Sequence, residues 1–459
     1  MSVGYQNLLT ITWNRFSAWR RGRRSGRKLY LGSRAETDDG RGGRIGIPLS
    51  DRTEHLGILG KTGTGKTSLL RYLCRQDIAA GHGFAFFDLH GDTTPFLLGL
   101  IADEEKRRGT DLSSRTILID PSDRERSVGI NILEALDEQD AFVEIAETVQ
   151  ILKHRWKLDA LGARTDELLR NTLYVLVSNG LTFLEISPLL TSDSFRARCL
   201  GRTPMGEARR YFEDRFDRLS PQNQAVYREA ILNKVSLYMA DPHFRHLLGQ
   251  RRSTIDLKQA VDSGAFVLLN LEKGRLGEEG ATLAALLLAK LKHAILARRT
   301  RRLFTLYCDE LQNLVAYDAG IDVLLSEARK FGVSVVSANQ YLDQYSPAMR
   351  AAVLAMGSHA FLQLSGLDAS RVSYWSGRGE QMAEHLRTLP RRHAVVRIRG
   401  RELCEAVVPE IRHPATIPLE LTRRVRGRCT SDRAAIEREI LERSASAVDG
   451  REGLGPEYT

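Results

Sequence analysis

The chain has 459 residues, of which 42% are hydrophobic and 27% are charged, values that exclude a disordered protein and indicate a folded globular one. The formal net charge of +10 favours an acidic partner, with nucleic acid the commonest candidate and an acidic membrane surface the second. Its five cysteines include no C-x-x-C pair, which argues against a disulfide framework and a zinc cluster. We expect two or three domains in a reducing cytosol.

Residues 1–29 are predicted to form a basic arm. Trp13, Phe16 and Trp19 recur at helical spacing, and cations follow at Arg20, Arg21, Arg23, Arg24, Arg27 and Lys28. A basic amphipathic helix of this kind lies on a membrane surface or docks on a partner. A disordered basic arm accounts for the same residues at least as well. The apolar stretch ATLAALLLAKLKHAILA is broken by Lys290 and Lys292, so it predicts a buried helix and not a membrane span.

Residues 30–136 and 251–411 alternate short apolar strands with helices. The strands are expected at His55–Gly60, Gly83–Asp92, Thr116–Pro121, Ala265–Gly274, Leu303–Glu310, Gly332–Asn339 and His359–Gly366. Continuous apolar strands that alternate with helices indicate a largely parallel sheet covered on both faces. The sequence therefore predicts an α/β core in two parts.

The pattern changes between these two parts and again at the end of the chain. Residues 137–250 have a helical texture and no convincing strand, so we expect an all-α domain inserted into the α/β core. Residues 412–459 are polar, with one helical run, RAAIEREILERSA, and are expected to form a polar C-terminal tail.

The strongest chemical signal is GKTGTGKT at Gly60–Thr67, which fits the pattern G-x-x-x-x-G-K-[ST] between a strand and a helix. The glycines let backbone N–H groups face the β-phosphate at the positive end of the helix. Lys66 is expected to reach the β- and γ-phosphates, and the Thr67 hydroxyl to hold Mg²⁺. The sequence thus predicts a site for ATP formed by Gly60, Lys61, Thr62, Gly63, Thr64, Gly65, Lys66, Thr67 and Ser68.

A second signal lies in LFTLYCDELQNL, where a hydrophobic strand ends in Asp309 and Glu310. An acid at the carboxyl end of such a strand faces the ligand crevice of the sheet. We expect Asp309 to bind Mg²⁺ through its water shell, and Glu310 to orient or deprotonate the attacking water. The adjacent acid favours hydrolysis over transfer to another substrate.

The stretch SEARKFGVSVVSANQ predicts the next strand of the sheet, with charged and amide residues at its two ends. Gln340, at the carboxyl end, is expected near the γ-phosphate. Arg329 lies at the opposite end and should not reach its own nucleotide, although it could reach that of a neighbouring subunit. Lys330 is explained equally well by the favourable charge of a cation at a helix end.

Together these elements resemble the additional-strand P-loop ATPases of the HerA/FtsK superfamily, and most of all the conjugative coupling proteins of type IV secretion systems. The matching stretches are GKTGTGKT, FFDLHGD, YCDELQNL and EARKFGVSVVSANQYLDQ, together with the inserted helical domain, over roughly residues 45 to 410. The spacing of Gln340 and Gln344 after the Arg-Lys-x-Gly turn is the most family-specific part.

The resemblance implies a RecA-like core and a hexameric, DNA-stimulated ATPase that moves DNA in conjugative or mobile-element transfer. Its catalytic residues would be Lys66, Glu310, Arg329 as an arginine finger supplied in trans, and Gln340 as a sensor. The helical domain would recognise secretion or relaxosome proteins or the cargo. We expect a cytoplasmic protein, with residues 1–28 as a candidate contact to the inner face of the cell membrane or to a membrane partner.

Two departures qualify this resemblance. Coupling proteins usually begin with transmembrane helices, and no such segment is recognisable here. HerA carries an N-terminal β-barrel, and fewer than sixty residues precede Gly60. A second hypothesis therefore keeps the fold but changes the role, to a soluble HerA-like ATPase that acts with a nuclease in repair or phage defence. A substrate-recruiting adaptor ATPase of a secretion system is a further form of it.

The DNA contacts are the least specific prediction. A translocase grips the phosphate backbone with basic and polar groups, and candidate cations lie at 273–275, 298–302 and 391–397. His90 is expected to position groups near the nucleotide. His243 and His246 lack carboxylate companions in the sequence and are expected to be structural.

Overall fold

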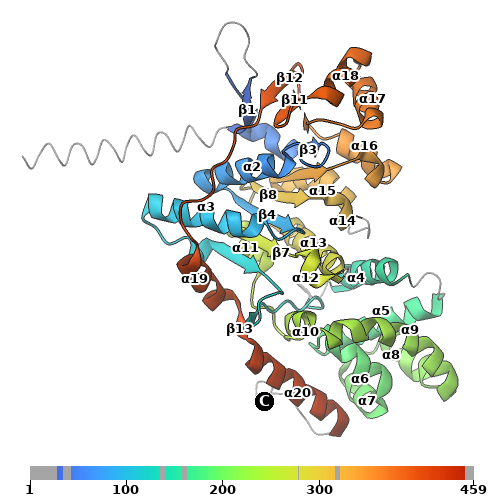
Figure 1. The fold of residues 1–459 in the computed structure, drawn as a ribbon. Coiled ribbons are helices and arrows are strands. Elements are labelled where there is room, and N and C mark those ends of the chain that lie inside the picture. Colours follow the sequence, from blue (N-terminus) through green and yellow to red (C-terminus); the bar gives the residue numbers. More distant parts are fainter. Residues whose placement is uncertain are drawn as a thin grey trace, which may run out of the picture.

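The computed structural model describes residues 28–34, 43–134, 141–157, 163–277, 279–315 and 321–449. An eleven-stranded sheet, in the order β2-β1-β12-β11-β10-β3-β9-β8-β4-β7-β5, forms its centre (Figure 1). The strands are β1 (Lys28–Arg34), β2 (Arg44–Pro48), β3 (Leu56–Leu59), β4 (Gly83–Asp88), β5 (Thr116–Ile119), β7 (Phe266–Asn270), β8 (Phe304–Asp309), β9 (Val333–Asn339), β10 (Ser358–Phe361), β11 (His393–Ile398) and β12 (Cys404–Val407). The predicted basic arm lies outside the described residues, apart from Lys28 and Leu29, which begin β1.

The parallel part of this sheet coincides with the strands expected from the sequence. From β10 through β3, β9, β8, β4 and β7 to β5, every neighbouring pair is parallel. β11, β12, β1 and β2 extend the sheet in antiparallel fashion and were not predicted. The α/β fold class with a largely parallel sheet is confirmed.

Helices cover both faces of the sheet because successive side chains of each buried strand point to opposite sides. In β4, Phe84 and Phe86 pack with α2 and α3, whereas Ala85 and Phe87 pack in the cluster that contains α13. The core helices are α2 (Lys66–Ala80), α3 (Thr93–Arg108), α11 (Leu257–Ser263), α12 (Lys273–Leu276), α13 (Glu279–Leu296), α14 (Leu311–Val315), α15 (Ile321–Glu327), α16 (Pro347–Leu354), α17 (Gly366–Trp375) and α18 (Glu380–Thr388).

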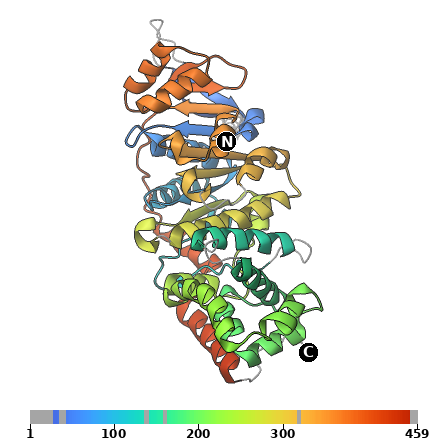
Figure 2. The ribbon, with the colours of Figure 1, turned by 90° about the vertical axis from the view of Figure 1, so that its right-hand side faces the viewer.

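A group of helices follows β5 and occupies one end of the elongated molecule (Figure 2). Its members are α4 (Ala141–Trp156), α5 (Ala163–Ser178), α6 (Ile186–Thr191), α7 (Asp193–Arg202), α8 (Glu207–Arg210), α9 (Pro221–Ala240) and α10 (Pro242–Leu248). Helix α4 packs on α13, and Lys290 pairs with Glu144 across this contact at 2.8 Å. The apolar core of these helices is continuous with that of one sheet face. The helical group is thus joined to the sheet through α13.

The segment 412–459, expected to be a polar tail with one helical run, contains two helices and a short strand that pack on the rest of the molecule. Helix α19 (Leu419–Cys429) packs against β5 and α3, and β13 (Ser431–Asp432) pairs with β6 (Arg126–Ser127). Helix α20 (Arg433–Asp449) then packs on α10 and α6 of the helical group. Its buried Ile436 and Ile440 contact Leu184. The segment is polar in composition, but a few of its apolar residues are buried and pack it against the rest of the molecule.

No helix within the described ranges is long and apolar enough to cross a membrane. Helix α13, which carries the longest apolar stretch, is buried along most of its length. Both of its interrupting lysines form ion pairs with α4, Lys290 with Glu144 and Lys292 with Glu147.

Candidate nucleotide-binding site

The predicted phosphate-binding loop connects β3 to α2. Its glycines Gly63 and Gly65 have φ values of 79° and 114°, in the left-handed region that a residue without Cβ adopts at little cost. Lys66 opens α2 and is buried, and its ammonium donates to the carbonyl oxygens of Gly60 at 2.8 Å and Lys61 at 3.0 Å. Burial lowers the pKa of Lys66, and the nearby Asp309 opposes this effect. The loop therefore holds a desolvated cation at the carboxyl edge of the sheet.

Asp309 ends β8, which lies two strands away from β3 in the sheet. Its carboxylate contacts the end of the phosphate-binding loop. Thr67 Oγ1 donates to Asp309 Oδ2 at 3.2 Å. Burial raises the pKa of Asp309 to about 6, because the ionised form is desolvated. A hydroxyl and a buried carboxylate in contact are hard oxygen donors of the kind that Mg²⁺ prefers. Thr67 and Asp309 thus bring together donor types that suit Mg²⁺, and their expected role as its ligands stays a prediction.

Glu310 follows with a φ of 62°, an uncommon backbone conformation for a residue with a side chain. Its carboxylate accepts from Gln340 Nε2 at 3.0 Å and from Asn313 Nδ2 at 2.8 Å. His90 Nε2 lies 3.4 Å from Glu310 Oε1. The hydrogen bond between the two lowers the pKa of Glu310 and raises that of His90 to about 9, so the pair is charged at neutral pH. The turn places this acid against His90 and Gln340, which come from two other segments of the chain.

Gln340 follows β9 and bridges two parts of the site. While its amide nitrogen donates to Glu310, its Oε1 accepts from Thr62 Oγ1 at 3.0 Å. The amide thus spans from the phosphate-binding loop to the acid. Gln344 holds the backbone here, because its side chain accepts from the N–H groups of Gln340 and Tyr341.

Asp88, which the sequence did not single out, fixes the loop that carries His90. Its buried carboxylate accepts from the backbone N–H groups of His90, Gly91, Thr93 and Thr94. This arrangement begins α3 and sets the direction of the intervening loop. The sequence held a signal for both Asp88 and Asn313, because each is a polar residue at or shortly after the end of a buried strand.

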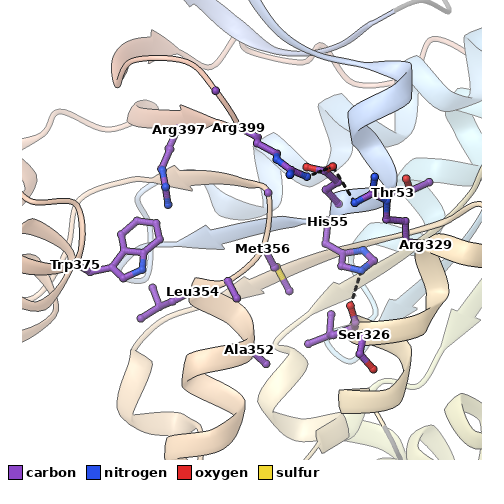
Figure 3. Close-up of a pocket in the computed structure, with 15 residues that line it drawn as sticks. Thr53, His55, Ser326, Arg329, Ala352, Leu354, Met356, Trp375, Arg397 and Arg399 are labelled. Atoms are coloured by element: carbon purple, nitrogen blue, oxygen red, sulfur yellow. Dashed lines mark hydrogen bonds and ion pairs between the residues drawn. The ribbon is translucent and has the colours of Figure 1, made fainter.

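Arg329 is not part of this crevice. It lies in a 3-10 turn, Ala328–Phe331, before β9, whereas Gln340 follows that strand. Seven strand residues place the two ends about 20 Å apart. Arg329 Nη1 instead pairs with Glu54 Oε1 at 3.1 Å in a pocket at the amino ends of β3 and β9 (Figure 3). Lys330 pairs with Glu327 at 3.4 Å.

Several candidate DNA cations have structural partners. The buried Arg298 donates to the carbonyl oxygens of Phe331 and Arg302, and Arg302 donates to those of Gly81 and Ser263. Lys273 and Arg275 are exposed beyond β7. The first stretch of cations thus stays accessible, while Arg298 is turned inward.

The two histidines expected to be structural contact carboxylates. His243 Nδ1 lies 2.8 Å from Asp241 at the start of α10, and His246 Nε2 lies 2.8 Å from Glu437 of α20. Neither belongs to a metal-type cluster within the described residues.

Comparison with known proteins finds a partial family match and several structures of similar fold. Residues 39–236 match the family model described as the central domain of helicase HerA. No curated protein matches the sequence. The plasmid coupling protein TrwB, in complex with a non-hydrolysable ATP analogue, aligns with a TM-score of 0.59 and 19% identity over 84% of this chain and 96% of that one.

Two further structures have similar folds. TrwB in complex with ADP and Mg²⁺ gives a TM-score of 0.55 and 17% identity over 85% of this chain and 97% of TrwB. VirB4 of Thermoanaerobacter pseudethanolicus gives 0.58 and 15% over 85% of this chain and 98% of VirB4. The chain thus has a fold similar to those of the coupling protein TrwB and of VirB4, and part of its sequence matches the central-domain model of helicase HerA.

Proposed function

We propose that this protein hydrolyses ATP and uses the energy to move DNA as a hexameric motor related to conjugative transfer. One observation carries the proposal: the predicted catalytic residues lie at opposite ends of the strands of one sheet. Lys66, Glu310 and Gln340 meet at the carboxyl edge, while Arg329 lies at the amino edge. A site built from two subunits accounts for this division.

Within one subunit, the chemistry follows from the contacts at the carboxyl edge. Lys66 and the loop would bind the phosphates, and Thr67 and Asp309 would hold Mg²⁺. The ion supplies charge neutralisation at the β- and γ-phosphate oxygens when bound. Glu310, ionised and aimed by its turn, would orient or deprotonate the attacking water. Gln340 would report the γ-phosphate to both Thr62 and Glu310.

Between subunits, Arg329 would act on the nucleotide of a neighbour. It is 61% exposed, so a partner can reach it. An arginine supplied in trans stabilises the charge of phosphoryl transfer and typically contributes about 10³–10⁵ in rate. A head-to-tail arrangement that closes into a ring provides this contact at every interface. The likeness to TrwB and VirB4 supports a ring of the coupling-protein kind, with DNA in its pore.

The other assignments follow from the same proposal. The helical group from α4 to α10 would contact secretion or relaxosome proteins, or the cargo. The motor would work in the cytoplasm, and residues 1–28 would attach it to the inner face of the membrane or to a membrane partner. Positive net charge supports an acidic partner.

One observation favours a second candidate. The family match over residues 39–236 is to helicase HerA, which supports a soluble HerA-like ATPase acting with a nuclease in repair or phage defence. An adaptor ATPase that recruits substrates to a secretion system remains a variant of it. Co-purification with a nuclease, against co-purification with relaxosome or secretion components, separates these roles.

The proposal is tested by the ATPase rate of the full chain with and without single- and double-stranded DNA. We expect DNA to stimulate the rate, and electron microscopy with DNA and an ATP analogue to show a six-fold ring with density in its pore. A rate that no DNA changes would contradict the motor.

A further inference from the structure

The pocket that contains Arg329 is a defined cavity at the edge of the sheet opposite the phosphate-binding loop. It has a volume of about 760 Å³. A 3-10 turn before β3, Leu49–Glu54, supplies Glu54, and β11 and the turn beyond it supply Arg397 and Arg399 (Figure 3). Trp375 and Met356 line its apolar part. The cavity therefore combines an apolar wall with a cluster of guanidinium groups.

Positive charge dominates this pocket. Three arginines face one carboxylate among its lining residues. His55 adds no charge at neutral pH, because burial lowers its pKa to about 4. Arg397 is stacked on the Trp375 ring at 4.4 Å, which leaves Arg329 and Arg399 as the more available pair. Their side chains are 61% and 64% exposed. An anion arriving from outside would meet these two guanidinium groups first.

Glu54 satisfies both arginines with a single oxygen. Its Oε1 forms an ion pair with Arg329 at 3.1 Å and accepts a hydrogen bond from Arg399, so the two cations share one oxygen. Its Oε2 is buried and has no hydrogen-bond partner among the described residues. A buried carboxylate oxygen without a donor carries a desolvation cost that weakens the arrangement. Glu54 therefore has one oxygen without a hydrogen bond, while the two arginines remain accessible to solvent.

We propose that Arg399 acts together with Arg329 on the nucleotide of the neighbouring subunit, and that Glu54 occupies both arginines until the neighbour's phosphate displaces it. This inference rests on the proposed ring-shaped ATPase. Two guanidinium groups that converge on one oxygen form an arrangement suited to a terminal phosphate, which offers several oxygens. Glu54 is an internal competitor for that position, and it keeps the cations together in a separated subunit.

The first test measures the ATPase rate of the full chain, with DNA, as a function of subunit concentration. Glu54→Gln removes the competing charge, so the concentration at half-maximal rate should fall about two- to fivefold. Glu327→Gln is the matched control, because it breaks the exposed ion pair with Lys330 next to Arg329 without touching the pocket. In an Arg329→Ala, Arg399→Ala background, Glu54→Gln should have no effect.

The second test concerns Arg399 itself. Arg399→Ala should lower the maximal rate at least tenfold, and mixing with Lys66→Ala subunits should restore part of it, because those subunits still supply Arg399. Arg399→Lys should retain more rate than Arg399→Ala. Thermal melting checks that each variant folds. If Glu54→Gln is unstable, Glu54→Asp, which is too short to span both arginines, should shift the midpoint in the same direction.

The outcomes separate this inference from the function on which it rests. A DNA-stimulated wild-type rate combined with Glu54→Gln that behaves like Glu327→Gln overturns the role of Glu54. Arg399→Ala at the wild-type rate overturns the role of Arg399. A wild-type protein that DNA does not stimulate overturns the proposed motor, and this inference with it.

Discussion

The Gln340 amide donates to the Glu310 carboxylate at 3.0 Å, although thirty positions separate the two residues in the chain. The same amide accepts from Thr62 of the phosphate-binding loop. One side chain thus contacts both the phosphate-binding loop and the acid. We expect Gln340→Ala to lower the ATPase rate about 10²-fold. Nucleotide affinity should change by less than about threefold, because Lys66 is untouched. An equal loss of affinity and rate would assign Gln340 to binding instead.

The roles of Lys66 and Glu310 can be separated by one substitution each. Lys66→Ala should abolish nucleotide binding, because it removes the buried cation of the loop. Glu310→Gln should bind nucleotide with near wild-type affinity and lose about 10² or more in turnover, since an amide cannot accept the water's proton. Binding of a fluorescent ATP analogue and phosphate release measure the two quantities. Turnover by Glu310→Gln near the wild-type rate would refute the assignment.

Arg329 should act across a subunit boundary. Arg329→Ala should lose about 10³ or more in rate as a homomer. Mixing it with Lys66→Ala should restore activity in part, because each variant supplies what its neighbour lacks. Lys330→Ala is the matched control, since the Lys330 side chain is about as exposed as that of Arg329 and pairs with Glu327, outside the pocket. If mixing restores nothing, Arg329 acts within its own subunit or not at all.

Two buried histidines should make the fold sensitive to acid. Burial lowers the pKa of both His55 and His359 to about 4, against an ordinary value of 6.5. The unfolded chain therefore binds more protons between pH 4 and 6.5, so stability falls as pH falls through that range. We expect a loss of about 2 kcal/mol per histidine between pH 7.5 and 5. Urea unfolding at both values measures it, and His359→Asn should flatten the dependence.

The final helix should stabilise the helical group through its buried face. Ile440→Asp places a charge in the contact with Leu184 and should cost about 3 kcal/mol or more. Leu441→Asp is the control, because Leu441 is 52% exposed. Limited proteolysis and thermal melting compare the two. Equal behaviour of the variants would mean that α20 contributes little to the stability of this region.

The sequence predicted those parts of the site whose signals are local. The phosphate-binding loop and the Asp309–Glu310 pair each follow a buried strand within a few residues, so motif and element support one another. The partners of Glu310 come from separate segments: His90 from the loop after β4 and Gln340 from the end of β9. The position of Gln340 at the end of a predicted strand placed it near the site, whereas no spacing in the sequence predicted that His90 contacts Glu310.

The strands and contacts that the sequence did not predict are formed between segments far apart in the chain. β1 and β12 lie at opposite ends of the chain, and no local pattern announces that they will pair. Arg298 shows the same problem for charge, since composition reveals a cation but not that its guanidinium is buried. Glu54, which holds Arg329, precedes it by 275 positions. Such contacts become visible only when the strand order is known.

The C-terminal segment changes how the helical group is attached to the sheet. The group is joined to the core by the chain that leaves β5 and by the chain that returns to β7. Helix α19 on β5 and helix α20 on α10 and α6 add a third connection along a separate path. Together with the packing of α4 on α13, these connections restrict rotation of the helical group relative to the sheet. Load applied to these helices would therefore reach the sheet at its β5 edge as well as through α13, whereas Lys66 follows β3 and Arg329 precedes β9, several strands away from β5.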